Sequence, residues 1–173
     1  MERSHPNIGF VTDDYIFFLG GIFSQWKPSL FTDESGRKFH TAEHYMMYHK
    51  LRTLGHAELA EEMILGTNPS VAKRIGRTAT ATPEALDEWD RTKFDVVVDG
   101  NMLKFLQNHA MRKEMLNLYP RGFVEASPYD KIWGIGLDIS NPDIRDPKNW
   151  RGQNLLGKAL DYVATVLAER NRP

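Results

Sequence analysis

The sequence predicts a mainly α-helical α+β fold, in which helices dominate and two short β pieces pack against them. Helix start signals recur along the chain, and apolar residues follow them at helical spacing. Short strand-like runs stand in the first 40 residues and again after residue 120. The chain has 173 residues, of which 41% are hydrophobic. This is enough to form the hydrophobic core of one domain but too little for two domains. We therefore expect a single domain across residues 1–173, with its core at about residues 15–169.

The β pieces are predicted from short apolar runs that turn residues bound. Residues 15–19 are strand-like and end at two glycines. Residues 30–39 indicate a small hairpin that leads into the next helix. Residues 122–127 and 132–138 indicate two further strands, and the turn between them, residues 127–131, has Pro and Asp at positions that favour a turn.

The helices are predicted from their caps and from apolar periodicity. Thr41, Asn68 and Thr82 are N-cap residues, and the last two stand directly before a proline at the first helical position. The helix that begins at Thr82 is the longest, and Gly100 either kinks it or ends it. Residues 139–150 form a polar loop. The expected helical segments are residues 41–51, 57–65, 68–76, 82–106, 111–118 and 154–169.

The segment of residues 41–51 differs from an amphipathic surface helix. Its tyrosines, methionines and leucine are apolar on nearly every side, which predicts a buried helix. Glu43 lies in its first turn, and a buried carboxylate is costly unless it is paired, so such groups are often tuned for chemistry. Lys50 follows two turns later on nearly the same face. The two residues indicate an active-site wall; the alternative is a first-turn Glu favoured by the helix dipole, with Lys50 solvated.

Composition and motifs exclude several classes of function. The formal net charge of −1 gives the chain no global attraction to nucleic acid or to an anionic membrane. The chain has no cysteine, which excludes disulfides and thiolate metal sites. No apolar run is long enough to span a membrane, and the first residues lack a signal-peptide core, so we expect a cytoplasmic protein without a membrane partner. The spacing of His44 and His49 argues against a metal site, and Gly134-Ile135-Gly136 is too short for a dinucleotide fingerprint. We expect no cofactor.

Several further residues are candidates for a site, and each also has an ordinary structural interpretation. Asp130 and Asp138 flank Trp133, although one fits a turn residue and the other a strand-end cap. Trp89 and Lys93 are one helical turn apart, as a core tryptophan and a lysine that reaches to solvent would be. Lys73 and Arg77 lie near the end of the segment of residues 68–76, where they fit either phosphate-binding residues or solvated side chains.

In combination these pieces resemble the NADAR family, also called YbiA-like, from about residue 17 to about residue 167. The most specific parts are the Glu-His-Tyr helix and a Ser-Pro-x-Asp-x-x-Trp-Gly-Ile-Gly-x-Asp segment. The sequence departs from the commoner pattern in the long loop between Asp138 and Gly152 and at Leu30. The residues that carry the resemblance are Phe18-Leu19, Phe23-Ser24-Gln25-Trp26, Pro28-Ser29, Phe31, Ala42-Glu43-His44-Tyr45, Lys50, Gly76-Arg77, Trp89, Lys93, Phe105, Val124-Glu125-Ala126-Ser127-Pro128, Asp130, Trp133-Gly134-Ile135-Gly136 and Gly152-Gln153-Asn154-Leu155-Leu156-Gly157.

The resemblance implies an N-glycosidase whose substrates are phosphorylated ribosylaminopyrimidine intermediates of riboflavin synthesis. The alternatives are a hydrolase that removes ADP-ribose from guanine in nucleic acid or nucleotides, and a non-catalytic module that binds ADP-ribose or a nucleotide. The partner is then a small ribosylated, phosphorylated molecule, or an ADP-ribosylated nucleic acid, and the oligomeric state stays open. By similarity the catalytic residues are Glu43, Asp138, Lys50 and Asp130, and the substrate-binding residues are Trp89, Trp133, Lys93, Arg77 and Trp26.

The chemistry of a ribosyl C–N bond suits these residue types. Its cleavage builds positive charge on the sugar, which a carboxylate stabilises, first Glu43 and then Asp138 or Asp130. The two tryptophans Trp89 and Trp133 would stack on the leaving base, and Arg77, Lys73 or Lys27 would hold a phosphate. In the covalent alternative, Lys50 or Lys93 attacks the sugar and forms a Schiff base. A plain helical domain, with Glu43 as a cap and the tryptophans in the core, is the remaining alternative.

Overall fold

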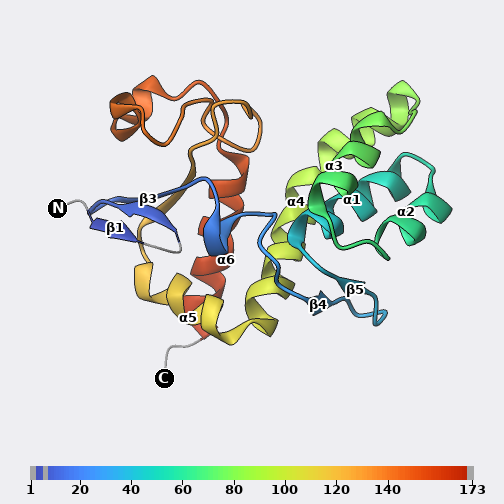
Figure 1. The fold of residues 1–173 in the computed structure, drawn as a ribbon, viewed down its shortest axis with the longest axis horizontal. Helices are drawn as coiled ribbons and strands as arrows, with labels where there is room; N and C mark the ends of the chain where they lie inside the picture. Colours follow the sequence, from blue (N-terminus) through green and yellow to red (C-terminus); the bar gives the residue numbers. More distant parts are fainter. Residues whose placement is uncertain (1–2, 6–7, 171–173) are drawn as a thin grey trace. The chain divides into compact units, whose positions relative to one another are not determined.

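A computed structural model describes residues 3–5 and 8–170 (Figure 1). The chain divides into two compact units, one made of Met1–Ser24 with Ala110–Pro173 and the other of Gln25–His109. In the described residues, the structure has six α-helices, a four-stranded sheet and a two-stranded sheet, which confirms the expected mainly α-helical fold with small β elements. Across this described part, no helix combines the length and apolarity that a membrane crossing requires.

The first unit contains the four-stranded sheet. Its strands lie in the order β1 (Arg3–His5), β2 (Gly9–Val11), β3 (Tyr15–Phe18) and β6 (Gly122–Glu125). The β1–β2 and β2–β3 pairs are antiparallel, whereas β3 and β6 are parallel. The strands predicted at residues 15–19 and 122–127 are therefore confirmed as β3 and β6, which are direct neighbours, whereas β1 and β2 were not predicted. Parallel pairing of such distant segments needs a long crossover, which the second unit supplies.

The outer edge of β6 is covered by side chains that belong to helix α6 (Leu155–Arg170) and to the residue before it. The Phe123 N–H donates to Asp161 Oδ1 at 2.8 Å, and the Glu125 N–H donates to Asn154 Oδ1 at 3.0 Å. Asn154 Nδ2 in turn donates to the Phe123 carbonyl at 2.9 Å. Because α6 packs against β6, these side chains take the place of another strand.

The strand predicted at residues 132–138 is wrong. This segment is irregular, and its backbone bonds go to different places: the Ile135 N–H donates to the Glu125 carbonyl, and the Ile135 carbonyl accepts from the Arg151 N–H. Gly134 lies so close to the chain that a Cβ there would be 2.9 Å from the Glu125 carbonyl oxygen, and Gly136 has a φ of +69°. Glycines at such positions break the ladder of a strand.

The polar loop of residues 139–150 is anchored to the core of the first unit. It contains two 3-10 turns, Pro142–Arg145 and Pro147–Asn149. The side chain of Ile144 is fully buried in a cluster with Phe17 and Leu137, and Trp150 donates its indole N–H to the Ile144 carbonyl at 2.7 Å. Two apolar side chains therefore hold a segment whose composition predicted only a loop.

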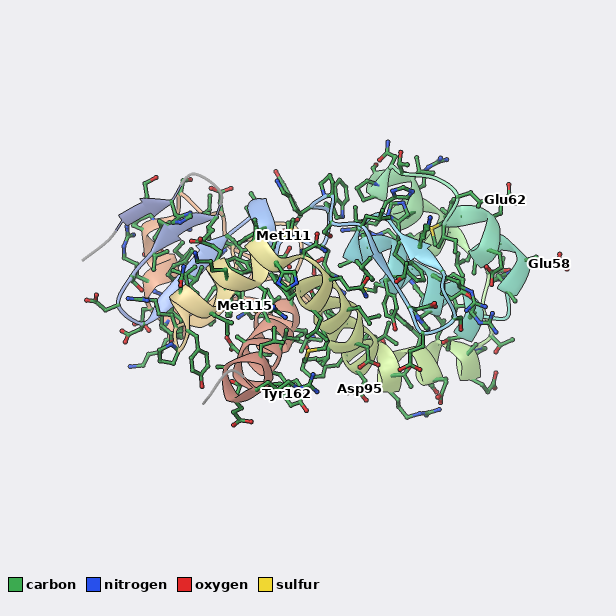
Figure 2. The ribbon with its side chains drawn as sticks, turned by 90° about the horizontal axis from the view of Figure 1, so that it is seen from below. Glu58, Glu62, Asp95, Met111, Met115 and Tyr162 are labelled. Atoms are coloured by element: carbon green, nitrogen blue, oxygen red, sulfur yellow. The ribbon has the colours of Figure 1, made fainter. Side chains whose placement is uncertain are left out.

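The second unit is organised around helix α1 (Ala42–Thr53). This helix packs against α2 (Ala57–Met63), α3 (Pro69–Thr78) and α4 (Pro83–Gln107). Its residues from Ala42 to Tyr48 are all buried, which confirms the prediction of a helix that is enclosed on nearly every side. Figure 2 shows Glu58 and Glu62 on α2, and both are exposed, whereas Ala60 and Met63 of the same helix are buried. The helix therefore turns one face to its neighbours and the other to solvent.

The predicted helix caps are confirmed. Thr41, Asn68 and Thr82 each cap a helix, and each side chain accepts a backbone N–H from the first turn. Helix α4 continues through Gly100, so the alternative that the helix ends at this residue is wrong. The reason is packing, because a Cβ on Gly100 would be 2.6 Å from the Tyr45 ring.

The remaining elements are short. The predicted hairpin is the antiparallel pair β4 (Phe31–Thr32) and β5 (Lys38–Phe39) in the second unit. Helix α5 (His109–Leu118) begins at the boundary between the units. Met111 and Met115, labelled in Figure 2, lie on α5, and Met115 is fully buried.

Candidate active site

Glu43 is held at the start of α1 by the groups that cap the helix. The Thr41 hydroxyl accepts the His44 N–H at 3.3 Å, and the Gln25 carbonyl accepts the Glu43 N–H at 2.9 Å. These two acceptors serve the first turn, whose N–H groups have no partner within the helix. The Glu43 residue itself is only 3% exposed. It is thus a buried carboxylate, as the interpretation of an active-site wall expects.

Lys50 lies in the same electrostatic neighbourhood, two turns along α1. Burial lowers the pKa of Lys50, the Arg77 guanidinium and the Lys93 ammonium lower it further, and the carboxylates of Glu43 and Asp90 raise it. The residue is half-buried, so the interpretation of a fully solvated Lys50 does not hold. We call these five side chains, contributed by α1, α3 and α4, the charged cluster.

Asp90 is the member of the charged cluster that sequence reasoning missed. Its Oδ1 lies 2.7 Å from Lys93 Nζ, and the Lys93 side chain is only 18% exposed, against 67% for Asp90. The two residues are three apart on α4, a spacing that places them side by side on a helix. That spacing was visible in the sequence. Lys93 is therefore held by an ion pair, whereas Lys50 is the cation whose pKa the surroundings lower.

The aromatic candidates of the second unit differ in exposure. Trp89 precedes Asp90 on α4 and is 7% exposed, as the core interpretation of this residue requires. Trp26 is 42% exposed, and Lys73 Nζ lies 5.7 Å from the centre of one of its rings. A cation over an indole face is a favourable contact. Trp26 therefore presents an aromatic surface next to α3, which also carries Arg77.

The second unit holds six of the nine predicted site residues, and four of these six belong to the charged cluster. The charged cluster has three cations and two carboxylates, and it combines a buried acid with an amine of lowered pKa. Such a combination can stabilise positive charge on a reacting sugar, act as a base, or provide a nucleophilic amine, while the excess of positive charge favours an anion. Within the described residues, no three His, Asp or Glu side chains gather into a group that would hold a metal ion.

The other three predicted residues belong to the first unit, where the two aspartates stabilise turns. Asp130 Oδ1 accepts the N–H groups of Ile132 and Trp133 at 2.9 and 2.8 Å. Asp138 Oδ1 accepts the Ser140 hydroxyl at 2.6 Å and its N–H at 2.9 Å, and these bonds lower the pKa of Asp138. Trp133 is half-buried. The catalytic roles of the two aspartates and the stacking role of Trp133 stay predictions.

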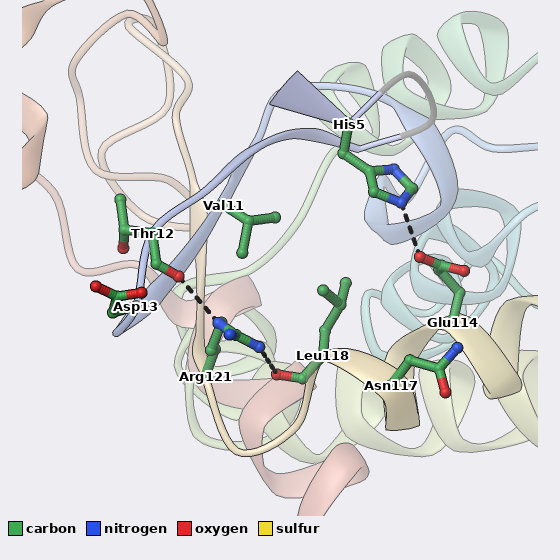
Figure 3. A pocket seen from close by; sticks show the side chains of 8 residues that line it. All are labelled: His5, Val11, Thr12, Asp13, Glu114, Asn117, Leu118 and Arg121. Atoms are coloured by element: carbon green, nitrogen blue, oxygen red, sulfur yellow. Dashed lines mark hydrogen bonds and ion pairs between the residues drawn. The ribbon is translucent and has the colours of Figure 1, made fainter. Parts of the chain in front are cut away.

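The first unit also has a pocket that no sequence pattern indicated. It has a volume of about 390 Å³ and lies between the N-terminal strands and α5 (Figure 3). His5 Nε2 is 2.9 Å from Glu114, and Arg121 donates to the carbonyls of Thr12 and Leu118. The charged side chains of the pocket thus fasten strand to helix. None of the predicted site residues lines it.

A buried Glu-His-Tyr helix with cations on two neighbouring helices, in a mainly helical α+β fold, agrees with the family that the sequence resembles. Residues 17–168 match the family model of the NADAR domain. The chain therefore belongs to the NADAR family. Its fold is also that of a solved structure, the Escherichia coli protein YbiA, with a TM-score of 0.75 and 25% identity over 97% of this chain and 93% of that one.

Curated relatives come from an animal, a virus and a plant. The protein irg-1 of Caenorhabditis elegans is 41% identical over 77% of this chain, which spans 63% of that protein's length. An N-glycosidase of Acanthamoeba polyphaga mimivirus is 39% identical, and the match covers 86% of this chain and 94% of the viral protein. The chloroplastic riboflavin biosynthesis protein PYRR of Zea mays is 32% identical over 86% of this chain and only 24% of the maize protein.

Proposed function

We propose that the protein is an N-glycosidase that hydrolyses the ribosyl C–N bond of phosphorylated ribosylaminopyrimidines. The observation that carries the proposal is the buried Glu43 carboxylate in one cluster with the half-buried Lys50 and the cations around it. The mimiviral relative is called an N-glycosidase and the maize relative a riboflavin biosynthesis protein. The first name supports the reaction, and the second supports the substrate class.

The carboxylate of Glu43 has the central role in the proposed reaction. As the C–N bond to the base breaks, positive charge develops on the sugar ring, and a fixed, buried carboxylate stabilises it. The same carboxylate can take a proton from the water that attacks the anomeric carbon, while the leaving base accepts a proton. Asp138 and Asp130 are the proposed sources of the second carboxyl group.

Lys50 is the better of the two candidate nucleophiles in the covalent variant of this mechanism. Its pKa is lowered by burial and by Arg77, so more of its amine is neutral, whereas Lys93 is paired with Asp90 at 2.7 Å. The amine would attack the anomeric carbon as the C–N bond breaks, and the base would leave with a proton. Opening of the ring gives a Schiff base, which water hydrolyses to release ribose phosphate and the free amine.

The substrate phosphate and the base are assigned to the cations and aromatic rings. Arg77 and Lys73 lie one turn apart on α3, where an i, i+4 spacing places both on one face. A guanidinium binds a phosphate through paired N–H groups. Trp26, whose ring lies next to Lys73, offers an aromatic face for the base, and the stacking roles of Trp89 and Trp133 stay predictions.

Release of ribose 5-phosphate from a ribosylaminopyrimidine phosphate tests the proposal. Glu43→Gln should lower the rate by about 100-fold or more, in the range of a lost acid or base. Glu62→Gln, an exposed glutamate on α2, is the matched control and should match wild type. A wild-type rate no higher than that of Glu43→Gln would refute the proposal. Tight binding by both proteins without turnover would instead indicate a binding module.

Reduction with borohydride during turnover distinguishes the two mechanisms. A Schiff base would be reduced to a stable adduct, whose mass would appear on the peptide that contains Lys50. Lys50→Met should abolish the adduct and Lys93→Met should not. Turnover without any adduct would favour direct attack by water assisted by Glu43.

A second candidate function is removal of ADP-ribose from guanine. The observation that favours it is the pair of cations Lys73 and Arg77 one turn apart on α3, since such a pair also suits a diphosphate. Release of ADP-ribose from an ADP-ribosylated guanine oligonucleotide, with no release of ribose 5-phosphate from the pyrimidine substrate, would select this candidate.

A further inference from the structure

Two buried carboxamides link α4 to the segment that precedes the hairpin. Gln25 is 8% exposed and Asn101, on α4, is fully buried. Asn101 Nδ2 donates to Gln25 Oε1 at 2.8 Å and to the Val97 carbonyl at 2.9 Å. Both acceptors require an N–H at this position, so the orientation of the Asn101 amide is fixed, and so is that of the Gln25 amide that it meets.

Gln25 also contacts Glu43 through its main chain. The Gln25 carbonyl accepts the Glu43 N–H at 2.9 Å. The same segment is held a second time where the Ser29 N–H donates to the His40 carbonyl at 3.0 Å. Two hydrogen bonds therefore connect Asn101 to the peptide group of Glu43, one to the side chain of Gln25 and one to its main chain, and α4 and α1 pack directly on each other.

Packing alone does not require amides at these two positions. Gln25 Nε2 and Asn101 Oδ1 are buried and have no hydrogen-bond partner among the described residues. A buried polar group without a partner is destabilising, whereas replacement of both partners of a hydrogen bond by apolar groups of the same shape is often neutral or stabilising. An unfavourable arrangement of this kind, next to a candidate catalytic residue, indicates a role in function and not in stability.

We infer that Gln25 and Asn101 are positioning residues for Glu43, which fix the first turn of α1 so that its carboxylate meets the sugar of the substrate. The inference rests on the proposed glycosidase function. Neither side chain is assigned a contact with the substrate. A displacement of a catalytic group by about 1 Å can lower a rate by about 100-fold, so the accuracy of this turn matters more than its stability.

The test compares apolar replacements of the pair with a matched amide elsewhere on α4. The double variant Gln25→Met with Asn101→Leu removes the link and keeps similar volumes. Gln107→Met is the control, because the Gln107 amide also joins α4 to another segment: it accepts the Thr32 N–H at 3.0 Å and donates to the Thr32 carbonyl at 2.8 Å. The rescue variant, Gln25→Asn with Asn101→Gln, exchanges the two side-chain lengths and restores an amide pair.

The double apolar variant should lower kcat for the ribosylaminopyrimidine phosphate by about 10- to 100-fold, with little change in KM and no loss of thermal stability. The rescue variant should recover part of kcat. Gln107→Met should lose stability without a change in kcat. Equal effects of both replacements on kcat, or a lower melting temperature of the double apolar variant with an unchanged kcat, would overturn the inference.

A second measurement keeps this inference separate from the proposed function. If the wild-type protein turns over no such substrate, the function fails, and hydrogen exchange of the Glu43 amide decides the positioning role. The exchange should be several-fold faster in the double apolar variant and unchanged in Gln107→Met, because only the first change frees the turn to open. An unchanged Glu43 exchange rate would overturn the inference whatever the activity.

Discussion

Replacement of Lys104 by Met should remove a pH dependence of stability that the wild-type protein shows between pH 7 and pH 9. Lys104 lies on α4, is fully buried, and has a pKa that burial, followed by the charge of Lys27, lowers from 10.5 to about 7. In this pH range the unfolded chain keeps the Lys104 proton and the folded chain releases it. The unfolded state therefore binds more protons, and stability rises as the pH rises.

The magnitude follows from the two pKa values. Each unit of difference between the folded and unfolded pKa values of Lys104 changes the free energy of unfolding by about 1.4 kcal/mol. Between pH 7 and pH 9 the folded protein has mostly lost the proton and the unfolded chain has not, so the free energy of unfolding should increase by about 2 kcal/mol. The range stops at pH 9 because tyrosines in the unfolded chain titrate at about pH 10. Burial raises the pKa of Tyr45 to about 12 in the folded protein, so this residue would add a second pH dependence above pH 9.

Urea denaturation at pH 7, 8 and 9 measures this slope for the wild type and for Lys104→Met. Lys158→Met, an exposed lysine on α6, is the control and should keep the wild-type slope. Lys104→Met should be nearly flat, because the buried amine that titrates is gone. A wild-type stability that does not change over this range, or a Lys104→Met slope equal to that of the wild type, would refute the reasoning.

Three further predictions concern residues that fix the fold. Gly100→Ala should lower stability by about 1–3 kcal/mol, because its Cβ would meet the Tyr45 ring; thermal unfolding measures it, and an unchanged melting temperature would contradict the close packing. Burial lowers the pKa of His44 to about 4, so its contribution to stability is complete above its unfolded pKa of about 6.5. Between pH 7 and pH 5 the wild type should lose about 2 kcal/mol more than His44→Gln in urea denaturation, and parallel losses would count against a neutral buried imidazole. Asn154→Gly keeps the positive φ of +52° but leaves two main-chain groups of β6 unbonded, which should cost about 1–3 kcal/mol for each buried group; a variant as stable as wild type would show that water replaces the side chain.

Local signals in the sequence predicted the helices well because helix caps act over three or four residues. The N-caps at Thr41, Asn68 and Thr82 lie where they were expected, and so does the buried character of α1. The wrong predictions concern segments whose structure depends on contacts with residues that are distant in the sequence. Gly100 fits a helix break until Tyr45 packs on it, and residues 132–138 have strand composition although their partners are Glu125 and Arg151. The strands β1 and β2 have three residues each, too few for an alternating pattern.

The candidate site could be predicted in part, for similar reasons. The spacing of Glu43 and Lys50 on one helix indicated a shared face, and the structure gives them a shared electrostatic environment. Asp90 has the same kind of signal, because it stands three residues before Lys93 on one helix. Gln25 and Asn101 are 76 residues apart in the chain, so no local pattern relates them, and only the packing of α1 on α4 makes their link to Glu43 visible.

The side chains that cover β6 also limit how this protein can associate. A strand at the margin of a sheet usually invites a strand from another molecule, which leads to sheet extension and aggregation. Here Asn154 and Asp161 occupy the N–H groups through which such an addition would begin. Another strand could pair with β6 only after α6 had detached from it, so the folded first unit prevents strand addition at this edge of the sheet.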